Sequence, residues 1–120
     1  KWYRLAAAQG VAQAMTNLGL LYNEGRGVPR NDGEAVRLFQ QAAQQGLPEA
    51  MHNLGCRYWK GEGVPKDRVY AYAWLNLAAQ SLESSKLSRE ALALEMPADE
   101  KKKAENLSRK WKKKFEIRTR

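Results

Sequence analysis

His52 and Cys56 have the side chains best suited to metal binding or nucleophilic chemistry, and they are the one histidine and the one cysteine of this chain. Their spacing of four residues would place them on the same face of a helix. A zinc site needs three or four ligands, and no second histidine or cysteine pair accompanies them. A catalytic cysteine–histidine pair needs an orienting partner and a substrate cleft, and the sequence indicates neither. We therefore expect no metal site, and we interpret both residues as part of the wall of a binding groove.

Other enzyme motifs are missing as well. Two glycine-rich loops, at residues 25–29 and 61–65, have Arg30 and Lys66 where the dinucleotide-binding pattern has its third glycine. There is no lysine-bearing phosphate loop, and no serine is followed by a lysine three residues later. The sequence favours a non-catalytic protein without a cofactor.

The same two loops, GRGVP and GEGVP, lie 36 residues apart and organise the rest of the chain. Glycine adopts positive φ at little cost, and proline lacks the amide hydrogen that a helix interior needs. Each loop is therefore predicted to end one helix and to reverse the chain before the next.

A self-comparison shows that the surroundings of the loops repeat too. Residues 11–46 align with residues 47–82 without a gap, and one further shift places residues 1–10 over the end of the first full copy, with Gly10 over Gly46. A fixed period of this length is typical of solenoid repeats. We predict a truncated repeat at 1–10 that contributes only its second helix, full repeats at 11–46 and 47–82, and capping helices with a basic tail at 83–120.

Within each full copy, apolar residues follow helical spacing and predict two helices with one apolar face each. In the first helix of the first full copy this face is formed by Ala14, Leu18, Leu21 and Tyr22. Gly19 and Gly55 lie inside predicted helices, where glycine costs about 1 kcal/mol relative to alanine, so they indicate close contact between paired helices. One such pair cannot bury its apolar face alone. We therefore expect an all-α superhelix, a solenoid of stacked helix-turn-helix repeats with a C-terminal helical cap.

Polar residues predict the helix ends. Asn31 or Asp32 can cap the second helix of one copy and Asp67 that of the next, while Gly46 stops a helix and Pro48 suits the following first turn. In the C-terminal cap, Ser84 or Ser85 is expected to cap a helix with an apolar face of Leu87, Ala91 and Leu94. After the interruption at Met96 and Pro97, a last helix is predicted to begin near Asp99 and Glu100 and to bury Ala104, Leu107, Trp111 and Phe115.

The repeated pattern of spaced alanines, an Asn-Leu-Gly triplet at residues 17–19, Tyr22 and the double-glycine loop resembles the Sel1-like repeat, a relative of the tetratricopeptide repeat. The resemblance covers residues 1 to about 82, and the closing segment resembles the C-terminal caps of cysteine-poor bacterial members. It implies a non-catalytic adaptor or scaffold that binds other proteins on a concave surface. Arg57 departs from the pattern, because it stands where Leu21 provides the usual apolar residue.

By this resemblance, the first helix of each pair lines the inner surface and binds a partner peptide or helix. With Leu18 and Leu54 as inward anchors, the expected partner-binding residues are Gln13, Thr16, Leu20, Asn23 and Glu24, then Glu49, His52, Cys56, Trp59 and Lys60. Trp59 is either an exposed binding anchor or a cover for the edge of the next helix pair, and the sequence leaves both open.

Charge is concentrated at the C-terminal end. Residues 1–100 carry eleven lysines or arginines and eleven acidic residues, whereas residues 101–120 carry ten and two, which accounts for the whole net charge of +8. We favour a solvated outer face of the capping helix. The alternative is an electrostatic tether to an acidic protein, an anionic membrane surface or nucleic acid.

The compartment and the oligomeric state stay open. No apolar run approaches the roughly 18 residues of a membrane span, and no signal peptide is visible. The sequence starts at Lys1 without methionine, so we expect a fragment or a processed product. A single cysteine allows no intrachain disulfide.

Overall fold

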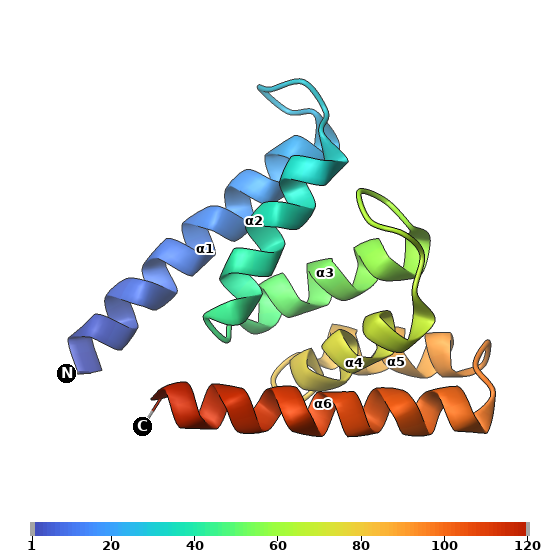
Figure 1. Ribbon diagram of the computed structural model, residues 1–120. Helices are drawn as coiled ribbons and strands as arrows, with labels where there is room; N and C mark the ends of the chain where they lie inside the picture. The colour runs from blue at the N-terminus through green and yellow to red at the C-terminus, as the bar shows by residue number, and fades with distance from the viewer. Residues whose placement is uncertain (1, 120) are drawn as a thin grey trace.

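The computed structural model describes the backbone of residues 2–119 and the side chains of residues 10–116 (Figure 1). Across this range the chain forms six helices and no strand: α1 (Trp2–Glu24), α2 (Asp32–Gln44), α3 (Pro48–Lys60), α4 (Arg68–Ala78), α5 (Glu83–Ala93) and α6 (Ala98–Thr119). α1 pairs with α2 and α3 with α4, α2 packs on α3, and α4 contacts both α5 and α6. The predicted all-α solenoid with a C-terminal helical cap is confirmed.

The two glycine-rich loops reverse the chain in the same way. Gly25 and Gly61 follow helices α1 and α3 with φ of +69° and +72°, in the left-handed region that glycine tolerates best. The backbone N–H of Asn31 then donates to the carbonyl of Tyr22, and that of Asp67 donates to Tyr58, both at 2.9 Å. These equivalent bonds fix the entry of the second helix in each pair.

The helix caps also follow the sequence prediction. Asn31 precedes α2 and accepts from the backbone N–H of Glu34, and Asp67 precedes α4 and accepts from that of Tyr70, each at 3.0 Å. These side chains satisfy amide donors that a helix N-terminus leaves without an intrahelical partner.

Gly19 and Gly55 allow the paired helices to approach closely, as predicted. A Cβ atom added at Gly19 would lie 2.7 Å from Cε1 of Phe39. One added at Gly55 would lie 2.9 Å from Cγ of Leu75 and 3.1 Å from the backbone oxygen of Ala71. The contact between α3 and α4 therefore has no room for a methyl group.

This contact gives a prediction with an internal control. We expect Gly55→Ala to lower the free energy of unfolding by about 1–2 kcal/mol, because overpacking outweighs the gain in helix propensity. Gly10→Ala should raise it by about 0.5–1 kcal/mol, since Gly10 also lies in a helix but has no atom within 4 Å of an added Cβ. Urea titrations followed by circular dichroism measure both, and a change of the same sign in the two variants would contradict the packing argument.

Two clusters of buried side chains hold the helices together. The first spans α1 to α4 and includes Phe39 and Leu54, both fully buried. The second joins α4 to the cap through Leu75, Leu92 and Ala104, also fully buried. The second cluster covers the end of the repeat stack with α5 and α6, which is the role expected of a cap.

Helix α1 differs from the sequence prediction. A helix boundary was expected at Gly10, but α1 runs without a break through this residue. The aligned stop at Gly46 has a φ of +87° and is followed two residues later by Pro48, whereas Gly10 is followed by Val11 and Ala12. Without a proline, every amide after Gly10 can donate within the helix, so nothing in the local chemistry ends it.

Because α1 is continuous, the predicted apolar face of this helix is partly uncovered. Leu18 and Leu21 are 40% and 38% exposed, and Ala14 is also exposed, whereas Leu54, which aligns with Leu18, is fully buried. Leu54 belongs to the cluster that includes residues of α2. Residues 2–10 extend α1 in line and do not fold back over Leu18 as α2 does over Leu54.

Helix α5 also differs from the prediction, both in its N-terminal cap and in the face that it buries. Neither Ser84 nor Ser85 caps it, because α5 begins at Glu83 after Leu82, which makes no side-chain cap bond. Leu87 and Leu94 are 63% and 90% exposed. The buried face carries Ser85 and Leu92 instead. Arg89 helps to set this rotation, because its Nη1 donates to Oδ1 of Asn76 in α4 at 2.7 Å.

The last helix agrees with the prediction in its position and buried face. It begins just after Met96 and Pro97 with acidic residues in its first turn, and Ala104 is fully buried. Trp111 stacks on Trp74 of α4 with ring centroids 4.4 Å apart. Among the described residues, no helix combines the length and the apolar character that crossing a bilayer requires.

Candidate partner-binding surface

The first helices α1 and α3 present side chains at equivalent positions of the two repeats. Five of these six positions are exposed and Asn53 is half-buried, and they pair as Gln13 with Glu49, Asn17 with Asn53, and Glu24 with Lys60. Nε2 of Gln13 donates to Oδ1 of Asn17 at 3.3 Å, and Nδ2 of Asn53 donates to the backbone oxygen of Glu49 at 2.9 Å. We call these six residues the first-helix face. Asn17 and Asn53 were not predicted as binding residues, although their recurrence after 36 residues was a signal.

Thr16 does not belong to this surface, contrary to the prediction. Its side chain is 1% exposed, and its Oγ1 donates to the backbone oxygen of Ala12 at 2.8 Å. Leu20 is half-buried and packs against the first core cluster. Both positions lie on the side of α1 that packs inside the repeat stack, so Thr16 is not available to a partner.

His52 and Cys56 lie between α3 and the cap. Nδ1 of His52 is 2.7 Å from Oγ of the buried Ser85, and Nε2 is 3.6 Å from Sγ of Cys56. Burial lowers the pKa of His52 and raises the pKa of the Cys56 thiol, so both side chains favour their neutral forms. Among the described residues, no group of three or more potential metal ligands gathers here or elsewhere. The contact of His52 with Ser85 joins α3 to α5, and both His52 and Cys56 are half-buried.

Trp59 is half-buried and packs against the second core cluster. Its Nε1 donates to Oε1 of Glu95, beyond the end of α5, at 3.4 Å. Of the two interpretations that the sequence left open, this position supports the one in which Trp59 covers the edge of the next helix pair.

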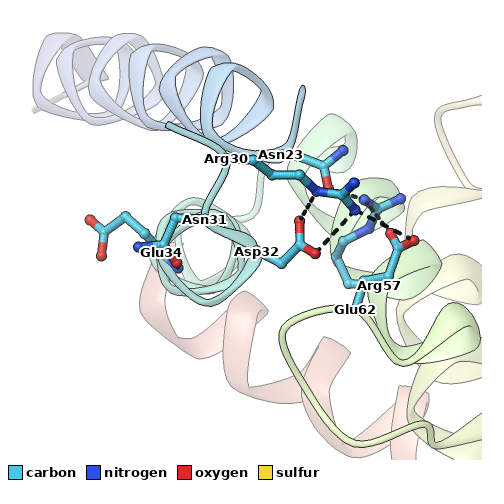
Figure 2. A network of polar contacts seen from close by, with 7 residues as sticks. All are labelled: Asn23, Arg30, Asn31, Asp32, Glu34, Arg57 and Glu62. Atoms are coloured by element: carbon cyan, nitrogen blue, oxygen red, sulfur yellow. Dashed lines mark hydrogen bonds and ion pairs between the residues drawn. The ribbon is translucent and has the colours of Figure 1, made fainter. Parts of the chain in front are cut away.

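Arg57 connects the two repeats, as Figure 2 shows. It is only 7% exposed, and its Nη1 donates to Oδ1 of Asn23 at the end of α1 and forms a 2.9 Å ion pair with Glu62 in the second loop. Glu62 also lies 4.0 Å from Arg30, which pairs with Asp32 at 3.2 Å. Asn23 was predicted to contact a partner, but the structure uses its side chain amide for this junction. The sequence signal for the junction was the charge of Arg57 at a position that is apolar in the preceding repeat.

The junction fixes how the two halves of the first-helix face lie relative to each other. Arg57 is in α3, while Asn23 is in α1 and Arg30 and Glu62 belong to the two loops, so the contacts cross from one repeat to the next. A surface that is already ordered before binding loses less conformational entropy when a partner arrives.

Comparison with known proteins agrees with the repeat and the fold. The Sel1 repeat matches at residues 1–11, 12–47 and 48–81. The crystal structure of c5321, a protective antigen of uropathogenic Escherichia coli with an SLR fold, superposes with a TM-score of 0.85 and 34% identity. A Sel1 repeat protein from Oxalobacter formigenes gives a TM-score of 0.67 and 35% identity over 70% of this chain.

These relatives are longer than the present chain. The match to c5321 covers 95% of this chain and 25% of that one, and the match to the Oxalobacter protein covers 35% of its chain. A curated relative, DAP3-binding cell death enhancer 1 of Rattus norvegicus, is 46% identical over 41 residues, which are 34% of this chain and 8% of that protein. Since the repeat matches cover most of the sequence and the fold agrees over nearly all of it, this chain belongs to the Sel1 repeat family.

Proposed function

We propose that this chain is a non-catalytic protein-binding module that holds a partner peptide or helix on the first-helix face. The observation that carries the proposal is that side chains at equivalent positions of α1 and α3 are exposed or half-buried and available to a partner. A partner lying across both helices would meet amide and charged groups at matching positions of the two repeats. Sel1 repeats in general mediate protein–protein interaction, and the rat relative is itself named for binding another protein.

The Arg57 junction supports this function because it orders the surface before a partner binds. The polar character of the face favours hydrogen bonding and charge pairing, which give specificity more than affinity. Gln13 and Glu49 are both exposed. They can therefore be changed with little effect on the core.

Affinity capture from a source lysate, read by mass spectrometry, tests the proposal. Gln13→Lys combined with Glu49→Lys should lose the proteins that the unchanged chain captures. The control combines Gln41→Lys with Glu105→Lys, which are exposed on α2 and α6 and change the net charge equally. Trp59→Ala is unsuited to this test, since it removes part of the packing on the cap. Equal capture by the two double variants, or no specific capture by the unchanged chain, would contradict the proposal.

A second candidate is the electrostatic tether, which the exposed side of α6 favours. The side chains of Arg109, Lys110 and Lys113 gather beside Asn106 at its surface. Within residues 10–116, every ion pair of the structure uses an arginine as its cation, so no α6 lysine is neutralised in this way. Sedimentation with phosphatidylserine vesicles at low and high salt tests this candidate. Equal binding to neutral vesicles, or binding that does not change with salt, would rule out a tether to an anionic membrane surface.

A further inference from the structure

A cavity of about 270 Å³ lies where α2, α3, α4 and α6 meet. Among the described residues, five aromatic side chains line it, namely Tyr58, Tyr70, Trp74, Trp111 and Phe115, and Leu54 contributes a further apolar wall. None of these residues belongs to the first-helix face. The proposed function therefore leaves the cavity without a role.

The aromatic side chains hold one another in place. Trp74 stacks on Trp111 at 4.4 Å, Tyr70 meets Trp111 edge-on at 5.5 Å, and Tyr58 lies 5.3 Å from Tyr70. Trp74 is only 6% exposed. Trp74 and Trp111 stack on each other, so these two faces are not open to a nucleic acid base, and the edge-on and tilted rings beside them form the walls of a recess.

The polar groups around the recess are amides, hydroxyls and an ammonium. Lys114 and Gln40 contribute to the lining, and no carboxylate among the described residues does so. Burial raises the pKa of the Tyr58 hydroxyl, which stays protonated and neutral at physiological pH. Lys110 is exposed one helical turn before Lys114 in α6. The recess is thus apolar inside and positively charged at its α6 side.

We infer that this recess binds one apolar side chain of an acidic peptide segment from a partner protein. Its volume lies below the roughly 300–1,000 Å³ of most small-molecule sites, but it suits a single leucine or aromatic anchor. Carboxylates beside the anchor would pair with Lys114 and with Lys110 one turn earlier on α6. A cationic ligand, which aromatic rings could otherwise attract, is disfavoured by Lys114.

The test titrates a labelled peptide, in which glutamates flank a central leucine and phenylalanine, into the isotope-labelled chain. Nuclear magnetic resonance follows the indole N–H of Trp111, and fluorescence polarisation gives the Kd. One matched peptide has glutamine for glutamate, another has alanine for both apolar residues, and a labelled oligothymidine reports on nucleic acid. Lys114→Glu is compared with Lys103→Glu, which makes the same charge change on α6 at an exposed residue outside the recess.

The acidic apolar peptide is expected to shift the Trp111 indole signal and to bind more tightly than both matched peptides. Lys114→Glu should weaken its binding about fivefold or more, and Lys103→Glu less than about twofold. Equal weakening by the two variants, an unmoved Trp111 signal, or tighter binding of the oligothymidine would overturn the inference. Because the first-helix face contributes none of the tested residues, failure here leaves the proposed function untouched, and the reverse also holds.

Discussion

Removal of residues 101–120 is expected to abolish the cooperative unfolding transition of this chain. Ala104 is fully buried, Ser108 is 2% exposed and donates to the backbone oxygen of Ala73 at 2.7 Å, and Trp111 covers Trp74. The truncation therefore uncovers the α4 side of the second core cluster. The loss is about 5 kcal/mol or more, comparable to the whole stability of a small domain. Circular dichroism during thermal unfolding measures it.

A matched control separates the packing of α6 from its charge. Lys102→Glu combined with Lys103→Glu changes two exposed residues of the same helix and leaves its buried side intact. This variant should melt within a few degrees of the unchanged chain. A truncated chain that melts as sharply as the full one would show that α6 does not cap the stack. It also follows that loss of binding on truncation would not identify a tether, so substitutions on α6 are the better tests of that candidate.

The sequence could predict the parts of the fold that depend on local chemistry. The loop glycines, the caps at Asn31 and Asp67, and the close contact at Gly55 each follow from the properties of one residue type in a repeated context. The 36-residue period strengthens these predictions, because each feature appears in both copies and the two occurrences predict the same structure.

The sequence could not predict which face of a helix the tertiary structure would bury. Leu87, Ala91 and Leu94 form an apolar stripe on α5, yet the structure turns Ser85 inward to meet His52, and Arg89 inward to bond Asn76. A polar residue with a partner across the interface can be buried, and only the arrangement of α3, α4 and α5 shows that this partner exists. The burial of Thr16 has the same cause, since its hydroxyl is satisfied within α1.

The two proposed binding surfaces were predictable to different degrees. The first-helix face was partly predicted, because exposed Gln13, Glu24, Glu49 and Lys60 follow from helical spacing and the repeat register. The aromatic recess was not, because its walls come from four helices. Tyr70 and Trp111 are 41 positions apart in the sequence, and no periodicity relates a repeat residue to one in the cap.

Arg57→Ala is expected to lower the free energy of unfolding by about 2–4 kcal/mol, because it leaves Asn23 and Glu62 without a buried partner and opens a space between the repeats. The loss stays below that of a fully enclosed ion pair, since the Glu62 side chain is 32% exposed. Arg37→Ala is the control. The Arg37 side chain is 54% exposed and bonds to Glu34 one turn earlier in α2, so its loss should change stability by less than about 0.5 kcal/mol. Urea titrations compare the two variants.

Arg57→Met shows which property of the arginine matters. Methionine keeps most of the side-chain volume but leaves Asn23 and Glu62 without their partner, as alanine does, so the expected loss is smaller than for Arg57→Ala by the cavity contribution alone, at about 1–2 kcal/mol. Nε of Arg57 is buried without a hydrogen-bond partner, which makes the buried charge less favourable. Removing this donor limits the loss of stability in both variants. If Arg57→Met is as unstable as Arg57→Ala, the pairing with Asn23 and Glu62 stabilises the junction more than the filled volume does. The first-helix face would then depend on these polar contacts to keep α1 and α3 in register.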